Sequence, residues 1–249
     1  MAWVAYLGEC IQPKMIKSYL THVKSLHVDA DLPFSITEAP IVQRLIRGIK
    51  RYHGEAGRKP KQPITLPILC TILSNLPNSP QYLHLQAAYC VAYSALLRCG
   101  EFTIKGGRFD PTINLMHGAV HLLPDAENPT HATLVLPTSK TDPFHRGVTI
   151  TITAAPPNVP TCPVQALKDL FRWDPHPENV PLFEESLGNA LSQGFFLKAI
   201  RQALLAGGHD PSAFASHSFR RGATSSTAVA GFSDYGALAQ RRLQAVPGN

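Results

Sequence analysis

The stretch His217-Ser-Phe-Arg220-Arg-Gly-Ala-Thr is the most informative part of this chain. It follows the loop sequence Asp210-Pro-Ser-Ala-Phe, and Ser216, directly before it, is a residue type that caps helices. Helical residues three apart share a face, so His217 and Arg220 can converge on one point. Backbone N–H groups at a helix N-terminus favour an anion at such a point. The stretch therefore predicts a new helix with a phosphate-binding arrangement at its first turn.

Composition limits the classes of protein that need to be considered. The chain has 249 residues, a formal net charge of +6 and a pI near 9.1. This length allows one large domain or two unequal ones, with ample apolar content for a core. The mild basicity favours a polyanionic partner.

Cysteine usage and hydropathy bear on the compartment. The five cysteines form no Cys-x-x-Cys pair, which indicates free thiols in a reducing environment. No apolar run reaches membrane-spanning length, and the first residues lack the pattern of a secretory signal. We therefore expect an intracellular protein with no membrane partner, nuclear in a eukaryotic cell and cytoplasmic otherwise.

The first 60 residues show helical periodicity. Apolar residues recur at helical spacing over 11–27 and over 41–49, and the second run carries Arg47, Lys50 and Arg51 on its polar side. The stretch 54–63 is rich in glycine, proline and lysine, as is typical of an exposed linker. We expect a domain boundary near residue 60.

The remaining residues predict a mixed domain. Thr65 and Pro67 are residue types that begin a helix, and the almost continuously apolar run 83–97 predicts a helix buried on all sides. Short runs rich in Val, Ile, Leu and Thr predict a small antiparallel sheet with strands at 119–123, 132–136 and 148–152. Further helices are expected over 164–173, over 190–205 and from His217 onward.

Arg98 ends the buried helix, in the sequence Ala95-Leu-Leu-Arg-Cys-Gly-Glu101. A buried charge without a partner is very costly, so this arginine needs an anion. Two interpretations remain open. The anion is Glu101, which then orients the arginine, or it is a ligand such as a phosphate.

The other candidate residues are weak signals when each is taken alone. Lys140 lies in the connection between the last two expected strands, where exposed lysines mostly have no specific role. A lone histidine such as His217 is more often packed or solvated than catalytic, and Arg220 with Arg221 is compatible with a solvated basic face. Their order along the chain is more informative than any one of them.

Other chemistries have little support. The sequence contains no Walker-type phosphate loop, no GxSxG and no GxGxxG motif. His117 and His121 have the spacing of a helical metal pair, but Gly118 and the strand expected around Val120 argue against a helix there. We expect packed or solvated histidines, no metal and no cofactor.

The motifs together resemble those of the tyrosine recombinase (phage integrase) superfamily, especially the integrase-like proteins of fungal mobile elements. Ala95–Glu101 is similar to the family's first arginine motif, and Thr138-Ser-Lys140-Thr-Asp to the lysine in its β-hairpin turn. The His217 stretch is similar to the box that carries the histidine and the second arginine. Residues 16–27 and 45–51 are similar to the helical core-binding domain. The resemblance spans nearly the whole chain, in the family's order.

This resemblance implies a fold and a partner. The fold would be mainly α (α+β), with a partial helical core-binding domain over residues 1–60. Residues 61–249 would form the catalytic domain, with a small antiparallel sheet and a truncated C-terminus. In that family the two domains form a clamp around duplex DNA, sometimes as a homo-oligomer. The residues expected to contact DNA phosphates are Arg47, Lys50, Arg51, Arg58, Lys59 and Lys61.

The resemblance also implies a chemistry. Arg98 and Arg220 would grip the non-bridging oxygens of a DNA phosphate, since guanidinium groups match the edges of a phosphate. Lys140 would protonate the leaving 5′ hydroxyl, and His217 would assist proton transfer. In the family a tyrosine attacks the phosphorus and forms a 3′-phosphotyrosine. Charge stabilisation does most of the work, so the reaction requires neither a metal nor ATP.

The chain departs from the family where the nucleophile belongs. The family's tyrosine lies well downstream of the second arginine, in a Gly-Arg-Trp-like context that this sequence lacks. Tyr235 is the only tyrosine after Arg220, and it comes earlier than the family's nucleophile. We therefore expect a recombinase-like DNA-binding protein that does not cleave DNA by itself. Two alternatives remain: an active strand-transferase that uses Tyr235 or a tyrosine supplied in trans, and a non-catalytic nucleic-acid-binding scaffold.

Overall fold

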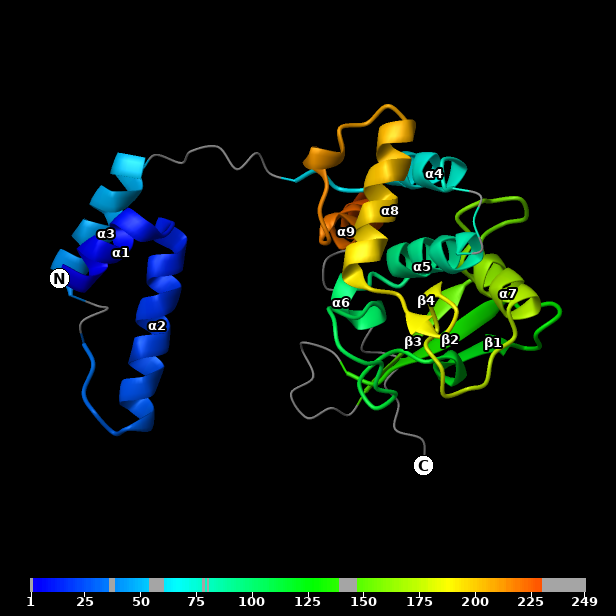
Figure 1. Cartoon of the computed structure of the whole chain (residues 1–249), viewed down its shortest axis with the longest axis horizontal. Coiled ribbons are helices and arrows are strands. Elements are labelled where there is room, and N and C mark those ends of the chain that lie inside the picture. The colour runs from blue at the N-terminus through cyan, green and yellow to red at the C-terminus, as the bar shows by residue number, and fades with distance from the viewer. Residues whose placement is uncertain are drawn as a thin grey trace. The chain divides into compact units, whose positions relative to one another are not determined.

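The computed structural model describes residues 2–35, 39–53, 61–77, 79, 81–138 and 147–229 (Figure 1). The chain divides into two compact units, Met1–Lys59 and Pro60–Asn249. All five cysteines are free. Within the described residues, no helix is both long and apolar enough to cross a membrane.

In the described part of the first unit, the chain forms three helices, α1 (Ala2–Cys10), α2 (Pro13–Asp29) and α3 (Pro40–His53). The periodic runs predicted α2 and α3, whereas α1 was missed. Gln12-Pro13 separates α1 from α2, because a proline at the first turn starts a new helix. One face of each helix contributes to a small core, made of Val4, Ile16, Leu20, Val42 and Ile46.

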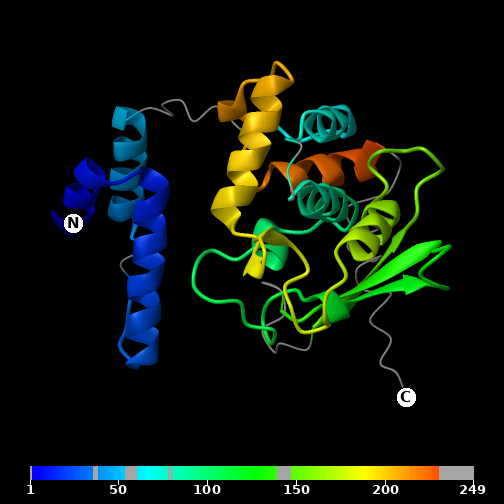
Figure 2. The same ribbon diagram turned by 45° about the vertical axis from the view of Figure 1, so that its right-hand side comes forward.

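The second unit is built around a central helix, α5 (Tyr82–Ser94), which is buried over most of its length as the sequence predicts. The other helices are α4 (Leu66–Ser74), α6 (Cys99–Phe102), α7 (Pro163–Trp173), α8 (Gln193–Ala206) and α9 (Ser218–Val229), with short 3₁₀ turns η2 (His117–Ala119) and η3 (Pro211–Ala213). The ring of Tyr89, on α5, packs between Phe196 of α8 and Phe219 of α9, with centroids 5.0 and 5.6 Å away. Three helices therefore meet at one aromatic cluster, and Figure 2 shows α5 among its neighbours.

A three-stranded antiparallel sheet lies beside the helices, in the order β1 (Val120–Leu123), β2 (His131–Leu136), β3 (Val148–Thr153). Alternate residues of β2 are buried against the helices, which is the period of a sheet with one face in the core. These strands agree with the predicted ones to within a residue or two at each end. The mainly α fold with a small antiparallel sheet is thus confirmed.

A second, two-stranded sheet was missed. It pairs β4 (Glu184–Ser186) with β5 (Asn189–Ala190) around a turn at Gly188. The helix expected from residue 190 is therefore wrong at its start, because Ala190 pairs with Glu184. Helix α8 begins only at Gln193, where the hydroxyl of Ser192 accepts a hydrogen bond from the backbone N–H of Phe195.

Candidate functional site

The end of α5 has an unusual backbone geometry. Leu96 follows the helix with a φ of 55°, in the left-handed region that glycine favours. The backbone N–H of Leu97 donates to the carbonyl of Ala92 at 3.0 Å, which is the six-to-one bond of a Schellman motif. This motif ends α5, and the carbonyl of Leu96 beyond it is available to a partner from another element.

Arg98 and Glu101 form a pair directly after this turn. The carboxylate Oε2 of Glu101 accepts the backbone N–H of Arg98 at 2.7 Å, and its Oε1 accepts the guanidinium NH1 at 2.9 Å. The side chain of Glu101 is 5% exposed and that of Arg98 is 24% exposed. Two anions were considered for Arg98, namely Glu101 and a bound ligand such as a phosphate. The structure contains the salt bridge to Glu101. A guanidinium has five N–H donors, so one bond to Glu101 leaves others for a second anion.

Helix α9 begins at Ser218, not at a cap formed by Ser216. The hydroxyl of Ser218 accepts the backbone N–H of Ala215 at 2.9 Å, and the carbonyl of His217 accepts the N–H of Arg221 at 3.1 Å. His217 therefore stands at the position before the first helical residue, with an exposed side chain. The predicted helix is present, but the prediction that Ser216 caps it was wrong because Ser218 closes the preceding turn instead.

Arg220 connects α9 to the end of α5. Its NH1 donates to the carbonyl of Leu96 at 2.9 Å, across 124 residues of sequence. Leu96 and Arg98 are two residues apart, so their Cα atoms are at most about 7.6 Å apart. The guanidinium of Arg220 thus lies near the stretch of backbone that carries Arg98.

The glycine of the His217 stretch has a packing role that sequence reasoning missed. The backbone N–H of Ile64 donates to the carbonyl of Ser218 at 2.9 Å, so the extended segment before α4 lies against the start of α9. A Cβ built on Gly222 would stand 1.7 Å from the carbonyl oxygen of Ile64. Any larger residue at this position would separate α9, and with it Arg220, from that segment. The only sequence signal for this contact was the glycine itself.

Several predicted residues lie outside the described part of the chain. They are Lys140, Tyr235, Arg58 and Lys59. Lys61 is described and exposed, and its ammonium group donates to the carbonyl of Ser212.

The basic residues predicted on the first unit are at the surface. Arg47, Lys50 and Arg51 are exposed on α3, while Val42 and Ile46 of the same helix are buried. The amphipathic pattern of the sequence therefore gives α3 a basic outer face, as expected of a helix that packs through one side.

His117 and His121 do not share a helix. His117 begins η2 and packs against Phe171 with ring centroids 4.2 Å apart, and His121 is exposed on β1. Among the described residues, no group of three or more His, Cys, Asp or Glu side chains has a metal-binding arrangement.

Comparison with known proteins gives matches at the level of structure. No protein-family model matches the sequence, and no curated protein matches it significantly. The structure resembles that of the Tn1549 transposon integrase, residues 82–397, solved in complex with circular intermediate DNA. The TM-score is 0.54 at 13% identity, over 97% of this chain and 75% of the integrase. A lambda integrase dimer bound to a COC′ core site matches with a TM-score of 0.47 at 17% identity, over 100% of this chain and 78% of that one. The chain therefore has an integrase-like fold.

Proposed function

We propose that this chain is a tyrosine-recombinase-like DNA-binding protein. Arg98 and Arg220 bind one phosphate of duplex DNA, with His217 and Lys140 as further members of the same site. The basic face of α3 and the residues around Lys61 contact the flanking backbone. The Tn1549 integrase, whose structure this chain resembles, was solved in complex with DNA.

The observation that carries this proposal is the bond from Arg220 to the carbonyl of Leu96. It brings the start of α9 to the turn that carries Arg98, so two guanidinium groups can reach one anion. Glu101 pairs with Arg98 and holds its guanidinium in a fixed orientation. A DNA phosphate would accept hydrogen bonds from both guanidinium groups, since guanidinium–phosphate pairs are frequently bidentate.

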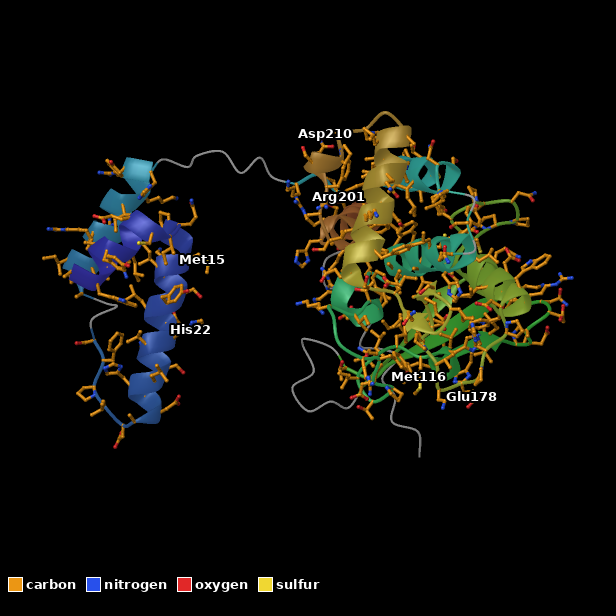
Figure 3. The ribbon with its side chains drawn as sticks, in the orientation of Figure 1. Met15, His22, Met116, Glu178, Arg201 and Asp210 are labelled. Carbon is orange, nitrogen blue, oxygen red and sulfur yellow. The ribbon has the colours of Figure 1, made fainter. Side chains whose placement is uncertain are left out.

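Fluorescence anisotropy with a labelled duplex tests the proposal. Arg98→Ala and Arg220→Ala should each weaken binding by about tenfold, the loss of a charge-assisted contact of roughly 1.4 kcal/mol. Arg201→Ala removes the same charge from the exposed surface of α8 (Figure 3) and should have much less effect. Affinity should fall steeply with salt because bound arginines and lysines release counterions. If all three variants weakened DNA binding equally, the binding would be explained by non-specific electrostatic attraction alone.

We further propose that this sequence binds DNA without cleaving it. The two arginines can position a phosphate, but they cannot replace an attacking hydroxyl held about 3 to 3.5 Å from the phosphorus. The sequence lacks a Gly-Arg-Trp motif, and Tyr235 stands early relative to the family's nucleophile. A suicide DNA substrate should therefore yield no covalent adduct with the chain. An adduct that disappears in Tyr235→Phe would identify an active strand-transferase instead.

A further inference from the structure

A second candidate site lies at the opposite end of α5 from Arg98 and Arg220, which are called the arginine pair below. A cavity of about 300 Å³ is bounded by the start of α5, the end of α7 and the β4–β5 hairpin. The side chains that matter for its chemistry are Leu83, His84, Trp173, Asp174, Glu184 and Leu187. From His84 to Ser94, the last residue of α5, the helix advances about 15 Å at a rise of 1.5 Å per residue, so the cavity is separate from Arg98 and Arg220.

A hydrogen-bond network fixes the polar wall of this cavity. The backbone N–H of Glu184 donates to Nδ1 of His84 at 3.1 Å, which leaves the proton of a neutral ring on Nε2. This Nε2 donates to Oδ2 of Asp174 at 2.7 Å, and Nε2 of His176 lies 3.0 Å from the same oxygen. Both histidines therefore bind one oxygen of Asp174. The other oxygen, Oδ1, has no hydrogen-bond partner within the described ranges.

The wall carries negative charge that its neighbours neutralise only in part. Burial disfavours the charged form of Asp174, but the hydrogen bonds from His84 and His176 outweigh it and hold the pKa of this carboxyl below its usual value. Glu184 is only 3% exposed, and its Oε2 accepts the N–H of Gly188 at 2.8 Å. Its Oε1 accepts no hydrogen bond from any described residue, and Nε2 of His176 is 3.9 Å away. A buried carboxylate with so little compensation favours a cation nearby.

The rim of the cavity suits a cation with an apolar stem. Trp173 is 75% exposed and Leu187 is 87% exposed, although both are large apolar residues. An indole attracts a cation over its face, and leucine side chains can cover the methylene groups of a long basic side chain. A planar guanidinium stacks on an indole and donates to a carboxylate at the same time, which a compact ammonium does less well. Free arginine would bring a carboxylate of its own to an acidic wall, whereas an arginine within a peptide would not.

We propose that this cavity binds an arginine side chain of a partner polypeptide. The guanidinium donates to Oδ1 of Asp174 and stacks on Trp173, while Leu83 and Leu187 cover its stem. The buried carboxylate of Glu184 also attracts the guanidinium electrostatically. In a chain with a net charge of +6, this is an acidic site for a basic protein partner, and it acts independently of the arginine pair.

Tryptophan fluorescence can test this site directly. The chain has two tryptophans, so the Trp3→Phe variant leaves Trp173 as the only reporter. The probe is the tripeptide acetyl-Ala-Arg-Ala-amide, and the matched neutral probe carries citrulline in place of arginine. The arginine peptide should change Trp173 emission saturably, with a Kd on the order of 1 mM. The citrulline peptide should bind about tenfold more weakly, because it lacks the charge-assisted bond.

Variants locate the binding. Asp174→Asn keeps an oxygen for the histidines but removes the charge, and should weaken the arginine peptide about tenfold. Glu178→Gln removes a nearby exposed carboxylate (Figure 3) that does not line the cavity, and should change nothing. Arg98→Ala should also leave peptide binding intact, which separates this site from the proposed DNA function. Circular dichroism confirms that each variant is folded. The proposal is wrong if both peptides bind equally, if Glu178→Gln matches Asp174→Asn, or if the arginine peptide leaves Trp173 emission unchanged.

Discussion

The two units of this chain differ sharply in how much core supports their helices. Among the described residues, the first unit has five buried apolar side chains in its core and the second has forty. Nine of the fifteen large apolar side chains that are exposed in the described part of the chain belong to the first unit, although it is much the smaller. Because burial of apolar surface is the main stabilising term in folding, the second unit should be far more stable than the first.

The exposed apolar residues of the first unit follow a pattern along α2. Met15, Tyr19 and Leu26 are 48%, 44% and 67% exposed, and with His22 they recur at helical spacing. Figure 3 labels Met15 and His22 on this helix. Ile16 and Leu20, on the other side of α2, are almost completely buried. One helix thus has apolar residues on two faces, of which only one is buried against the described residues of its unit. The sequence periodicity predicted the helix but not which of its faces is covered.

The largest effect that we predict concerns Gly222. Gly222→Ala places a Cβ against the carbonyl of Ile64, and neither backbone can move without breaking the contact between α9 and the segment before α4. The second unit should lose at least about 3 kcal/mol of stability, the upper range for overpacking. Gly100→Ala is the control, because no atom lies within 4 Å of a Cβ built there. It should be neutral or slightly stabilising. Thermal unfolding followed by Trp173 fluorescence measures the stability of both variants. Similar melting temperatures would contradict the close approach of Gly222 to the backbone of Ile64.

Core truncations should separate the two units. Ile16→Ala in the first unit and Leu134→Ala in the second each remove a side chain that is 0% exposed, and each should cost about 3 kcal/mol. The first unit contains Trp3 and the second Trp173, so single-tryptophan variants report on each unit separately. Ile16→Ala should unfold the first unit at room temperature and leave the Trp173 transition unchanged. Leu134→Ala should lower the midpoint of the unfolding transition that Trp173 reports and leave the one that Trp3 reports unchanged. A single transition seen by both tryptophans would show that the units unfold together.

Acidification should weaken the second unit through His117. Burial, and then the charge of His176, lower the pKa of His117 below its ordinary value of 6.5. The unfolded chain therefore takes up a proton near pH 6.5 that the folded chain binds only at lower pH. The free energy of unfolding should be unaffected by this group above pH 6.5 and should fall as the pH drops below it.

Urea unfolding at pH 7.5 and 5.5, followed by Trp173 fluorescence, measures how much the free energy of unfolding of the second unit falls on acidification. His117→Gln should lose less stability on acidification than the unmodified chain, since glutamine does not titrate. His121→Gln changes an exposed histidine on β1 and should behave as the unmodified chain does. Identical pH profiles for all three would mean that His117 is not the group responsible.

Much of the fold could be predicted from the sequence because its signals are local. The strands β1 to β3 follow alternation within six residues or fewer, and the Arg98–Glu101 pair follows from a spacing of three. Contacts between distant segments left no such signal. The bond from Arg220 to Leu96 involves a backbone carbonyl, which any residue supplies, so only the order of the motifs led us to expect the start of α9 near the end of α5. The His84–Asp174–Glu184 network joins residues up to 100 positions apart, so no spacing revealed it.

The smallest effects that we predict concern two residues with the same backbone conformation. Asp31 follows the first unit's α2 with a φ of 53°, and Leu96 follows α5 with a φ of 55°. Glycine removes the steric cost of this conformation, but it also raises the entropy of the unfolded chain. Asp31 is exposed, so these terms nearly cancel and Asp31→Gly should change the first unit's stability by less than about 0.5 kcal/mol. Leu96 packs against the core, so Leu96→Gly should cost the second unit about 1 kcal/mol. Its carbonyl remains for Arg220, so DNA affinity should not change. A loss of affinity as large as in Arg220→Ala would show that the left-handed turn depends on the leucine side chain.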